Sequence, residues 1–178
     1  NYSAAIDISD YSDTTLMEMR NFLVENNRIQ NNAFGFWLLS PIDLTIRNNL
    51  IIHQAGGNNI AAGNAADHVT RGLQIENNTF YDNPNGIMVY YSPERVVFRN
   101  NIVHQSSGSA DRALVFRDAS VEIASNNNLY DMPDFETASP FAIDQSHHGL
   151  SAFQALGYET DSIAAAARFT NVPQSCQR

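Results

Sequence analysis

QIENNTFYDN, residues 74–83, contains an asparagine pair that is followed two positions later by a large apolar residue. The same pattern recurs in LVENNRIQNN (23–32), TIRNNLIIHQ (45–54) and VFRNNIVHQ (97–105). Successive pairs are separated by steps of 22, 29, 23 and 26 residues. A unit that repeats at this length is typical of a solenoid, in which each unit forms one coil. The pairs are Asn26-Asn27, Asn48-Asn49, Asn77-Asn78, Asn100-Asn101 and Asn126-Asn127.

Short apolar segments surround each pair and alternate with period two, which predicts β-strands. Examples are GFWLL (35–39) and ALVF (113–116) well before a pair, and LTI (44–46) leading into one. A third strand begins at the apolar residue after each pair, and about 22 residues then leave no room for a helix. We therefore predict one domain, an all-β parallel β-helix of about five coils stacked about 4.8 Å apart. The residues that begin the third strands are Ile29, Ile51, Phe80, Val103 and Leu129.

The asparagine pairs have a structural explanation. A tight bend between strands needs a residue that tolerates a left-handed backbone, and Asn does so better than most non-glycine residues. Its neighbour can point inward, where its amide bonds to the equivalent Asn of the next coil. Stacked amides then satisfy one another, which avoids the cost of burying an unpaired polar group.

Composition and charge limit the function. The chain has 178 residues, 43% of them hydrophobic, with ten Arg or Lys against nineteen Asp or Glu and a net charge of −9. An acidic surface disfavours nucleic acid and anionic membranes, because phosphate binding requires basic patches. No apolar stretch is long enough to cross a membrane. Cys176 is the only cysteine, so the chain forms no internal disulfide.

The coils GFWLLSPIDLTIRNNLIIHQ (35–54) and GIMVYYSPERVVFRNNIVHQ (86–105) resemble the right-handed parallel β-helix repeat of pectate-lyase-like proteins. The tail GLSAFQALGYETDSIAAAARF (149–169) is similar to the helical ending of many secreted bacterial members, although Ala166-Ala167-Arg168 replaces their usual Asp-Pro. The resemblance implies a right-handed solenoid located outside the cell or on its surface. This superfamily includes polysaccharide lyases, hydrolases, epimerases and non-catalytic surface proteins, so fold alone does not fix the activity.

The two ends of the solenoid differ. We assign residues 1–131 to the coils and 132–178 to a C-terminal cap, with a short helix from Ser151 as N-cap to Gly157 as stop that presents Phe153 and Leu156. A second, Ala-rich turn is expected near residues 161–168. The first coil starts at AAIDIS without a covering segment. We therefore expect another chain, in a homo-oligomer, or an N-terminal remainder of the same protein to complete it.

Two outward columns follow from the repeat. The strand entering each pair carries Glu25, Arg47, Glu76 and Arg99 in succession, which predicts a structural ladder of ion pairs. The outward-facing positions on the first strand of each coil are unusually apolar for a surface. We expect this surface to be covered by the tail or an insertion, to contact another subunit, or to bind sugar rings through Trp37, Met88 and Tyr90. This column reads Asp7 and Ser9, Trp37 and Leu39, Ala61 and Gly63, Met88 and Tyr90, Val115 and Arg117.

Histidines are the main candidates for chemistry. His53 and His104 occupy similar places two coils apart, with Asp82 on the coil between, although strict counting puts His104 one position earlier than His53. Such a group could bind a metal or supply an acid and a base, and polar turn residues are the alternative. In a polysaccharide lyase, His53 or His104 would be the base, and Arg71 would neutralise the uronate carboxylate.

The long step between Asn49 and Asn78 contains the extra segment AAGNAADHVTR (61–71). Loops inserted in a solenoid often shape a binding groove, so Asp67 and His68 are candidate substrate-binding residues, with a plain surface loop as the alternative. The predicted strands carry no paired-carboxylate signature, and this argues against a hydrolase. Calcium is the one cofactor that the acidic clusters could hold, but neither cluster has the spacing of a defined calcium loop, which favours turn capping. These clusters are Asp7/Asp10/Asp13 and Asp131/Asp134/Glu136.

The leading functional hypothesis is therefore a secreted or cell-surface β-helix that binds or processes polysaccharide, with a polysaccharide lyase as the enzyme class if it is catalytic. The alternative is a non-catalytic structural or adhesive β-helix that forms oligomers. Composition and repeat do not separate the two hypotheses.

Overall fold

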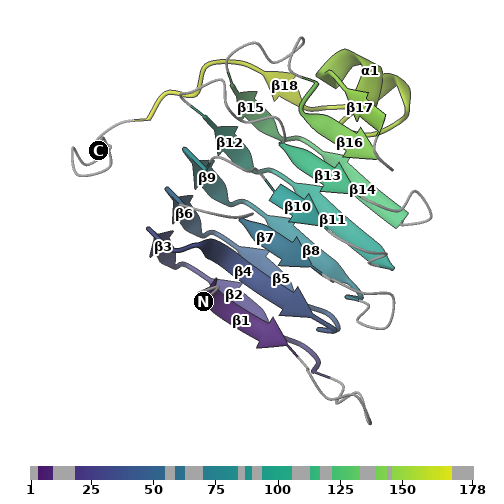
Figure 1. Cartoon of the computed structure of the whole chain (residues 1–178). Coiled ribbons are helices and arrows are strands. Elements are labelled where there is room, and N and C mark those ends of the chain that lie inside the picture. Colours follow the sequence, from purple (N-terminus) through teal and green to yellow (C-terminus); the bar gives the residue numbers. More distant parts are fainter. Residues whose placement is uncertain are drawn as a thin grey trace.

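Figure 1 shows the computed structural model, in which short strands stack from coil to coil along one axis. Its description covers residues 4–9, 19–54, 59–62, 70–83, 87–89 (backbone only), 94–105, 113–116, 122–132, 139–143 and 146–169. No helix in these segments is long and apolar enough to cross a membrane.

Three sheets form the walls of the solenoid, and all strand pairs are parallel except β16 with β17. The predicted class, an all-β parallel β-helix, is confirmed. The first sheet contains β1 (Ala4–Ser9), β4 (Phe34–Leu39), β7 (Ile60–Ala62), β10 (Ile87–Val89), β13 (Leu114–Phe116), β16 (Phe141–Ile143) and β17 (Ser146–His148). The second contains β2 (Leu23–Glu25), β5 (Thr45–Arg47), β8 (Leu73–Glu76), β11 (Arg95–Arg99) and β14 (Glu122–Asn126). The third contains β3 (Arg28–Gln30), β6 (Leu50–Ile52), β9 (Thr79–Tyr81), β12 (Ile102–His104), β15 (Leu129–Asp131) and β18 (Ile163–Ala164).

The first asparagine of each pair forms the bend between the second and third sheets. All five have φ between 55° and 60°, the left-handed region that Asn tolerates. The last of them is Asn127, so the fifth pair is Asn127-Asn128 and the predicted pair Asn126-Asn127 is wrong by one residue. β14 extends through Asn126, which pairs with Arg99. The left-handed residues are Asn26, Asn48, Asn77, Asn100 and Asn127.

This shift also changes the equivalent residue on the third strand. Tyr130, and not Leu129, pairs with Val103 and fills the inward position. Three consecutive asparagines at 126–128 allow two alignments, and backbone pairing selects the later one because it keeps β14 in register with β11.

The second asparagine of each pair points inward and builds an amide ladder, which we define as Asn27, Asn49, Asn78, Asn101 and Asn128. In each step, one Oδ1 accepts hydrogen bonds from both the backbone N–H and the Nδ2 of the preceding coil. Asn78 Oδ1 accepts from Asn49 N at 3.0 Å and from Asn49 Nδ2 at 3.1 Å. Asn101 Oδ1 accepts from the same two groups of Asn78 at 2.9 and 3.2 Å. All hydrogen bonds of the ladder therefore run in one direction along the axis.

Glu159 closes the ladder at its C-terminal end. Asn128 Nδ2 donates to both carboxylate oxygens, at 3.2 and 2.9 Å, and Tyr130 Oη donates to Oε1 at 2.9 Å. The hydroxyls of Ser125 and Ser162 also donate to Glu159. The carboxylate is fully buried, and these donors replace the water that it would otherwise bind. Burial raises the pKa of Tyr130 well above its ordinary value of 10.0, and the charge of Glu159 raises it further.

A second row of amides lies after the third sheet and was not predicted. Asn32 N donates to Gln54 Oε1 at 3.2 Å, and Gln54 N donates to Asn83 Oδ1 at 2.9 Å. Gln105 Nε2 continues the row by donating to the backbone oxygen of Asn83 at 2.7 Å. The row mixes Asn with Gln, so a search for repeated asparagine pairs does not find it.

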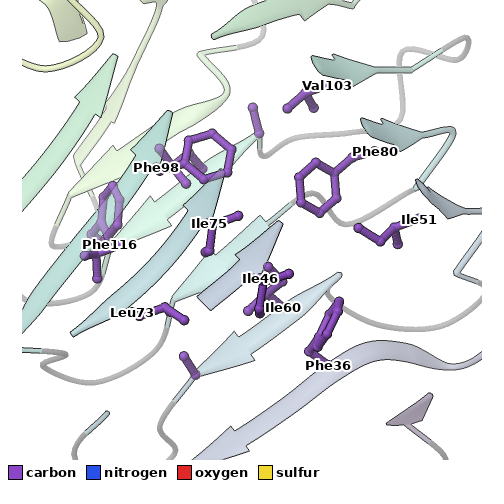
Figure 2. Packing of buried hydrophobic residues seen from close by; sticks show 14 of the residues in the cluster. Phe36, Ile46, Ile51, Ile60, Leu73, Ile75, Phe80, Phe98, Val103 and Phe116 are labelled. Atoms are coloured by element: carbon purple, nitrogen blue, oxygen red, sulfur yellow. The ribbon is translucent and has the colours of Figure 1, made fainter. Parts of the chain in front are cut away.

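Between the sheets lies one continuous apolar core (Figure 2). Inward positions repeat from coil to coil, so like side chains stack on each other: Ile46 pairs in register with Ile75, which pairs with Phe98. These three side chains are fully buried. Each contributes about 1.5 to 3 kcal/mol relative to full exposure.

The predicted ladder of ion pairs is confirmed in part, as two separate pairs on the outer face of the second sheet. Arg47 Nε lies 2.7 Å from Glu25 Oε2, and Arg99 Nη2 lies 2.8 Å from Glu76 Oε1. These side chains are part-exposed, so each pair contributes less than about 1 kcal/mol.

At the C-terminal end the helix α1 (Leu150–Ala155) packs over the core through Leu150 and Phe153. The predicted N-cap Ser151 is wrong, because Gly149 holds that position and Ser151 lies inside the helix. Gly157 has φ +92°, which fits its predicted role as the stop. Leu156 does not pack on the core and is 54% exposed.

Beyond the helix, the expected Ala-rich turn is wrong in part, since residues 163–164 form strand β18 on β15. The predicted boundary between the coils and the C-terminal cap, at residue 131, stays a prediction. β16, which pairs with β13, continues the first sheet into the segment assigned to the cap.

We predict that Asn78→Ala and Asn101→Ala each lower the free energy of unfolding by about 1 to 3 kcal/mol, because each leaves buried donors and acceptors unpaired. Asn27→Ala is the matched control. It removes the same amide from an exposed position and should cost less than about 1 kcal/mol. Urea unfolding followed by circular dichroism measures all three. Equal losses at Asn27 and Asn78 would contradict the buried ladder.

Tyr130→Phe tests how the ladder is closed. Near pH 7 it should cost about 1.5 to 3 kcal/mol, the value of a hydrogen bond to a charged group. The raised pKa of Tyr130 makes this contribution fully present below pH 10.0, the unfolded value, and lost as the pH rises toward the folded value. The difference in unfolding free energy between wild type and variant should therefore shrink above about pH 10. A difference that stays constant into alkaline solution would show that the hydroxyl is not held this way.

Candidate functional site

Four polar side chains meet where strands of the third sheet end. His53 and Asp82 follow β6 and β9 and occupy left-handed bends, with φ of 49° and 50°. His104 and Asp131 are the last residues of β12 and β15 and lie in register with Tyr81 of β9. We call His53, Tyr81, Asp82, His104 and Asp131 the His–Tyr face. The strict count along the sequence, which put His104 one position earlier than His53, is confirmed.

Within the His–Tyr face, Asp82 lies between the two imidazoles. Its Oδ2 is 3.6 Å from His53 Nε2, and its Oδ1 is 3.9 Å from His104 Nε2. The other nitrogen of His104, Nδ1, lies 2.6 Å from Asp131 Oδ2. The exposed fractions of these four side chains are 17 to 23%, so solvent reaches each of them in part. A relay of alternating imidazole and carboxylate groups therefore runs across four coils.

Aromatic rings form the rest of the face. Tyr81 stacks on His104 with ring centroids 4.6 Å apart and an interplanar angle of 25°, and its centroid lies 6.0 Å from that of His53. Phe169 approaches edge-on, 5.2 Å from both Tyr81 and His104. The polar relay thus lies beside an apolar surface that is also part of the outer wall.

The C-terminal segment holds Phe169 over this face. After β18, Ala165 N donates to Tyr130 O at 3.0 Å, and Ala167 N donates to Asp131 Oδ2 at 3.0 Å. The segment then continues from β15 back across β12 to Tyr81 on β9. In Figure 1 this yellow segment runs from β18 toward the ends of β12 and β9. It therefore covers part of the His–Tyr face, which accounts for the low exposure of its side chains.

Chemically, the face offers donors and acceptors of hydrogen bonds next to aromatic rings. Asp131 orients the His104 ring by holding Nδ1, which leaves Nε2 directed toward Asp82. Imidazole and carboxylate groups can exchange protons with a bound hydroxyl. The arrangement is suited to a ligand that has both hydroxyl groups and apolar ring faces.

Arg71 is not brought to the histidines. It lies at the corner that enters β8, in an isolated bridge with Ile42, and its Nε is 2.9 Å from Glu94 Oε1. His53 instead follows β6, and His104 ends β12, both in the third sheet. A role for Arg71 as carboxylate neutraliser stays a prediction, and the described contacts give it no partner among His53 and His104.

Most of the predicted sugar platform falls outside the description. Asp67, His68 and Tyr90 lie outside the described residues, and of Met88 only the backbone is described. Trp37 is half-buried and packs edge-on against Phe34, with centroids 5.4 Å apart. The roles of these residues in binding stay predictions.

The predicted outward register of the first sheet is confirmed, since Trp37, Ala61, Met88 and Val115 follow one another in the strand pairing. Ala61 and Val115 are nonetheless buried, at 3% and 6% exposed. Val115 packs against Ala142 of the neighbouring strand β16. The three alternatives for this face therefore stay predictions. Gly63 and Arg117 lie outside the described residues.

Of the two acidic clusters only Asp7 and Asp131 are described, so a calcium role for the clusters stays a prediction. Asp7 accepts a hydrogen bond from the Ser9 hydroxyl, and Asp131 is held by His104 and Ala167. The remaining members lie outside the described residues: Asp10, Asp13, Asp134 and Glu136.

Three parallel sheets closed by amide ladders, with a His–Tyr face on the outer wall, define the class of this protein as a parallel β-helix. The model of a protein family described as "Periplasmic copper-binding protein (NosD)" matches residues 3–147. This match spans most of the chain, so the protein belongs to that family, whose fold is a right-handed parallel solenoid. The periplasmic description is compatible with the predicted extracellular or cell-surface location. No curated protein and no solved structure shows significant similarity to the chain.

The family description implies copper, and the described residues do not fit it. No group of three His, Cys, Asp or Glu side chains among them is arranged to hold a metal ion. His53 and His104 lie on coils two apart, roughly 10 Å along the axis, and the carboxylate of Asp82 lies between their Nε2 atoms, at 3.6 and 3.9 Å. Copper favours imidazole and sulfur ligands that converge on one position. The His–Tyr face is therefore better described as a relay of neighbouring imidazole and carboxylate groups, with a hydrogen bond between His104 Nδ1 and Asp131.

We predict that Phe169→Ala raises the rate at which diethyl pyrocarbonate modifies His104 by at least about fivefold, because the ring no longer shields the imidazole. Mass spectrometry of the digested protein measures the rate at each histidine. Exposed His147 serves as the internal reference, and Leu156→Ala, at an exposed site without a ring contact, is the matched control. An unchanged rate at His104 would contradict the placement of the C-terminal segment.

Proposed function

We propose that this protein is a non-catalytic polysaccharide-binding β-helix, whose His–Tyr face binds a neutral glycan chain. The observation that carries the proposal is the position of the Tyr81 ring between two histidines, with Asp82 and Asp131 beside it. Aromatic rings pack on the apolar faces of sugars, and carboxylate and imidazole groups bond to their hydroxyls.

The length of the face supports a polymer as ligand. Its residues come from β6, β9, β12 and β15, four successive strands of the third sheet. At the spacing of parallel strands they extend over roughly 14 Å along the axis. A face of this length contacts more than one linked sugar ring, so its affinity should increase with chain length.

Charge supports a neutral glycan over a uronate. The face carries two carboxylates, Asp82 and Asp131, and the whole chain has a net charge of −9. Arg71, the residue expected to neutralise a uronate, is paired with Glu94 at another corner of the coil. A lyase must stabilise the substrate carboxylate before a base removes the neighbouring proton. The described geometry therefore supports binding more than lyase chemistry.

A glycan array followed by calorimetry with the best neutral oligosaccharide tests the proposal. Tyr81→Ala should weaken binding at least about tenfold, because it removes the aromatic surface at the centre of the face. Trp37→Ala is the matched control on the first sheet and should change the affinity less than about twofold. Loss of binding with Trp37→Ala alone would move the site to the first sheet and overturn the assignment.

Incubation with alginate, pectate and a glycosaminoglycan separates binding from catalysis. The proposal predicts no unsaturated ends that absorb in the ultraviolet. Their formation, reduced at least about a hundredfold by His104→Ala, would show a lyase instead. Neither binding nor turnover across the panel would favour the alternative, a structural or adhesive β-helix.

A further inference from the structure

The solenoid end formed by β1, β2 and β3, here called the β1–β3 end, is incompletely buried. Among the described residues, each of these strands lies at the edge of its sheet and pairs on one side. Core-facing side chains lose burial there: Ile6 and Val24 are part-exposed, whereas Phe36 and Ile46, their partners one coil further, are fully buried. This end therefore exposes core-facing apolar surface and unpaired strand edges.

The amide ladder is open at the same end. Asn27 is exposed, whereas Asn49, its equivalent in the next coil, is only 2% exposed. Asn27 uses both side-chain hydrogens, donating from Nδ2 to Asn49 Oδ1 at 3.1 Å and to Glu25 O at 2.9 Å. Its Oδ1 accepts no hydrogen bond from any described residue. Within the described part of the chain, the β1–β3 end thus presents an acceptor that lacks a donor.

The direction of the ladder determines what can bind. Every Oδ1 further along accepts from the backbone N–H and the Nδ2 of the coil before it, as Asn49 Oδ1 does from Asn27. A second copy of the chain does not supply these two donors. Its own β1–β3 end would bring one Asn27 Oδ1 against another, and its opposite end is closed by Glu159 and α1.

We infer that the β1–β3 end is an interaction surface for a parallel β-solenoid coil that carries an inward-pointing amide. The amide would donate to Asn27 Oδ1, its flanking strands would pair with β2 and β3, and apolar side chains would cover Val24. The partner is thus defined by its chemistry: an extended segment with an Asn or Gln at the register of Asn27. This surface is separate from the His–Tyr face and does not depend on saccharide binding.

A copy of residues 20–33 joined directly ahead of Ala4, in place of residues 1–3, tests the surface. Residues 31–33 connect β3 to β4, and Ala4 pairs with Phe34, so the copy places its two strands beneath β2 and β3. The amide equivalent to Asn27 in the copy would then face Asn27 Oδ1. The melting temperature should increase by at least about 5 °C over wild type.

The matched control is the same extension with that copied asparagine replaced by Asp. A carboxylate cannot donate to Asn27 Oδ1, so at least half of the gain in melting temperature should be lost. Equal melting temperatures for the two extensions, or no gain with either, would overturn the inference. Light scattering on the unextended chain is the second arm and should give the monomer mass of 19.8 kDa. A dimer that Val24→Lys dissociates while Leu156→Lys does not would also overturn it, because the surface would then accept a second copy.

Discussion

The hydrogen bonds between stacked asparagine amides are the constraint on which the rest of this structure depends. Each coil must bend between its second and third strands, and the left-handed residue that makes the bend brings the next side chain into the core. A buried amide is costly unless both its donors and its acceptor are satisfied. Asn49, Asn78 and Asn101 meet this requirement only because the coils above and below carry the same residue at the same register. The repeat is thus enforced by polar groups as much as by the apolar core.

The hydrogen bonds of the ladder all run in one direction along the axis, and this makes the two ends of the solenoid different. Each amide of the ladder donates to the next coil, so the last amide, Asn128, needs an acceptor. Glu159 is this acceptor, a carboxylate that only accepts hydrogen bonds. An acceptor remains at Asn27, on the surface. The chain that closes the ladder through Glu159 also continues through β18 to Phe169, which lies on His104. Closure of the core and cover of the candidate site are therefore produced by one C-terminal segment.

Much of the fold could be predicted from the sequence because the asparagine pairs and the period-two strands are local patterns that the solenoid repeats. The fifth pair was misplaced because three consecutive asparagines fit the pattern twice, and only pairing of β14 with β11 decides between them. His53, Asp82 and His104 were recognised as a group from spacing. Tyr81 and Phe169 were not, because the spacing of the histidines does not point to Tyr81 and Phe169 reaches the face through a fold-back that no local pattern encodes. An amide four or five residues after each of the first four ladder positions, as at Gln54, is the signal for the second row of amides.

Hydrogen exchange of the side-chain amides measures the ladder most directly. In NMR spectra of the folded protein, the Nδ2 protons of Asn78 and Asn101 should exchange at least about a hundredfold more slowly than those of Asn27, because the ladder encloses the first two and leaves the third at the surface. Equal exchange at all three positions would contradict a buried, directional ladder as the basis of the fold.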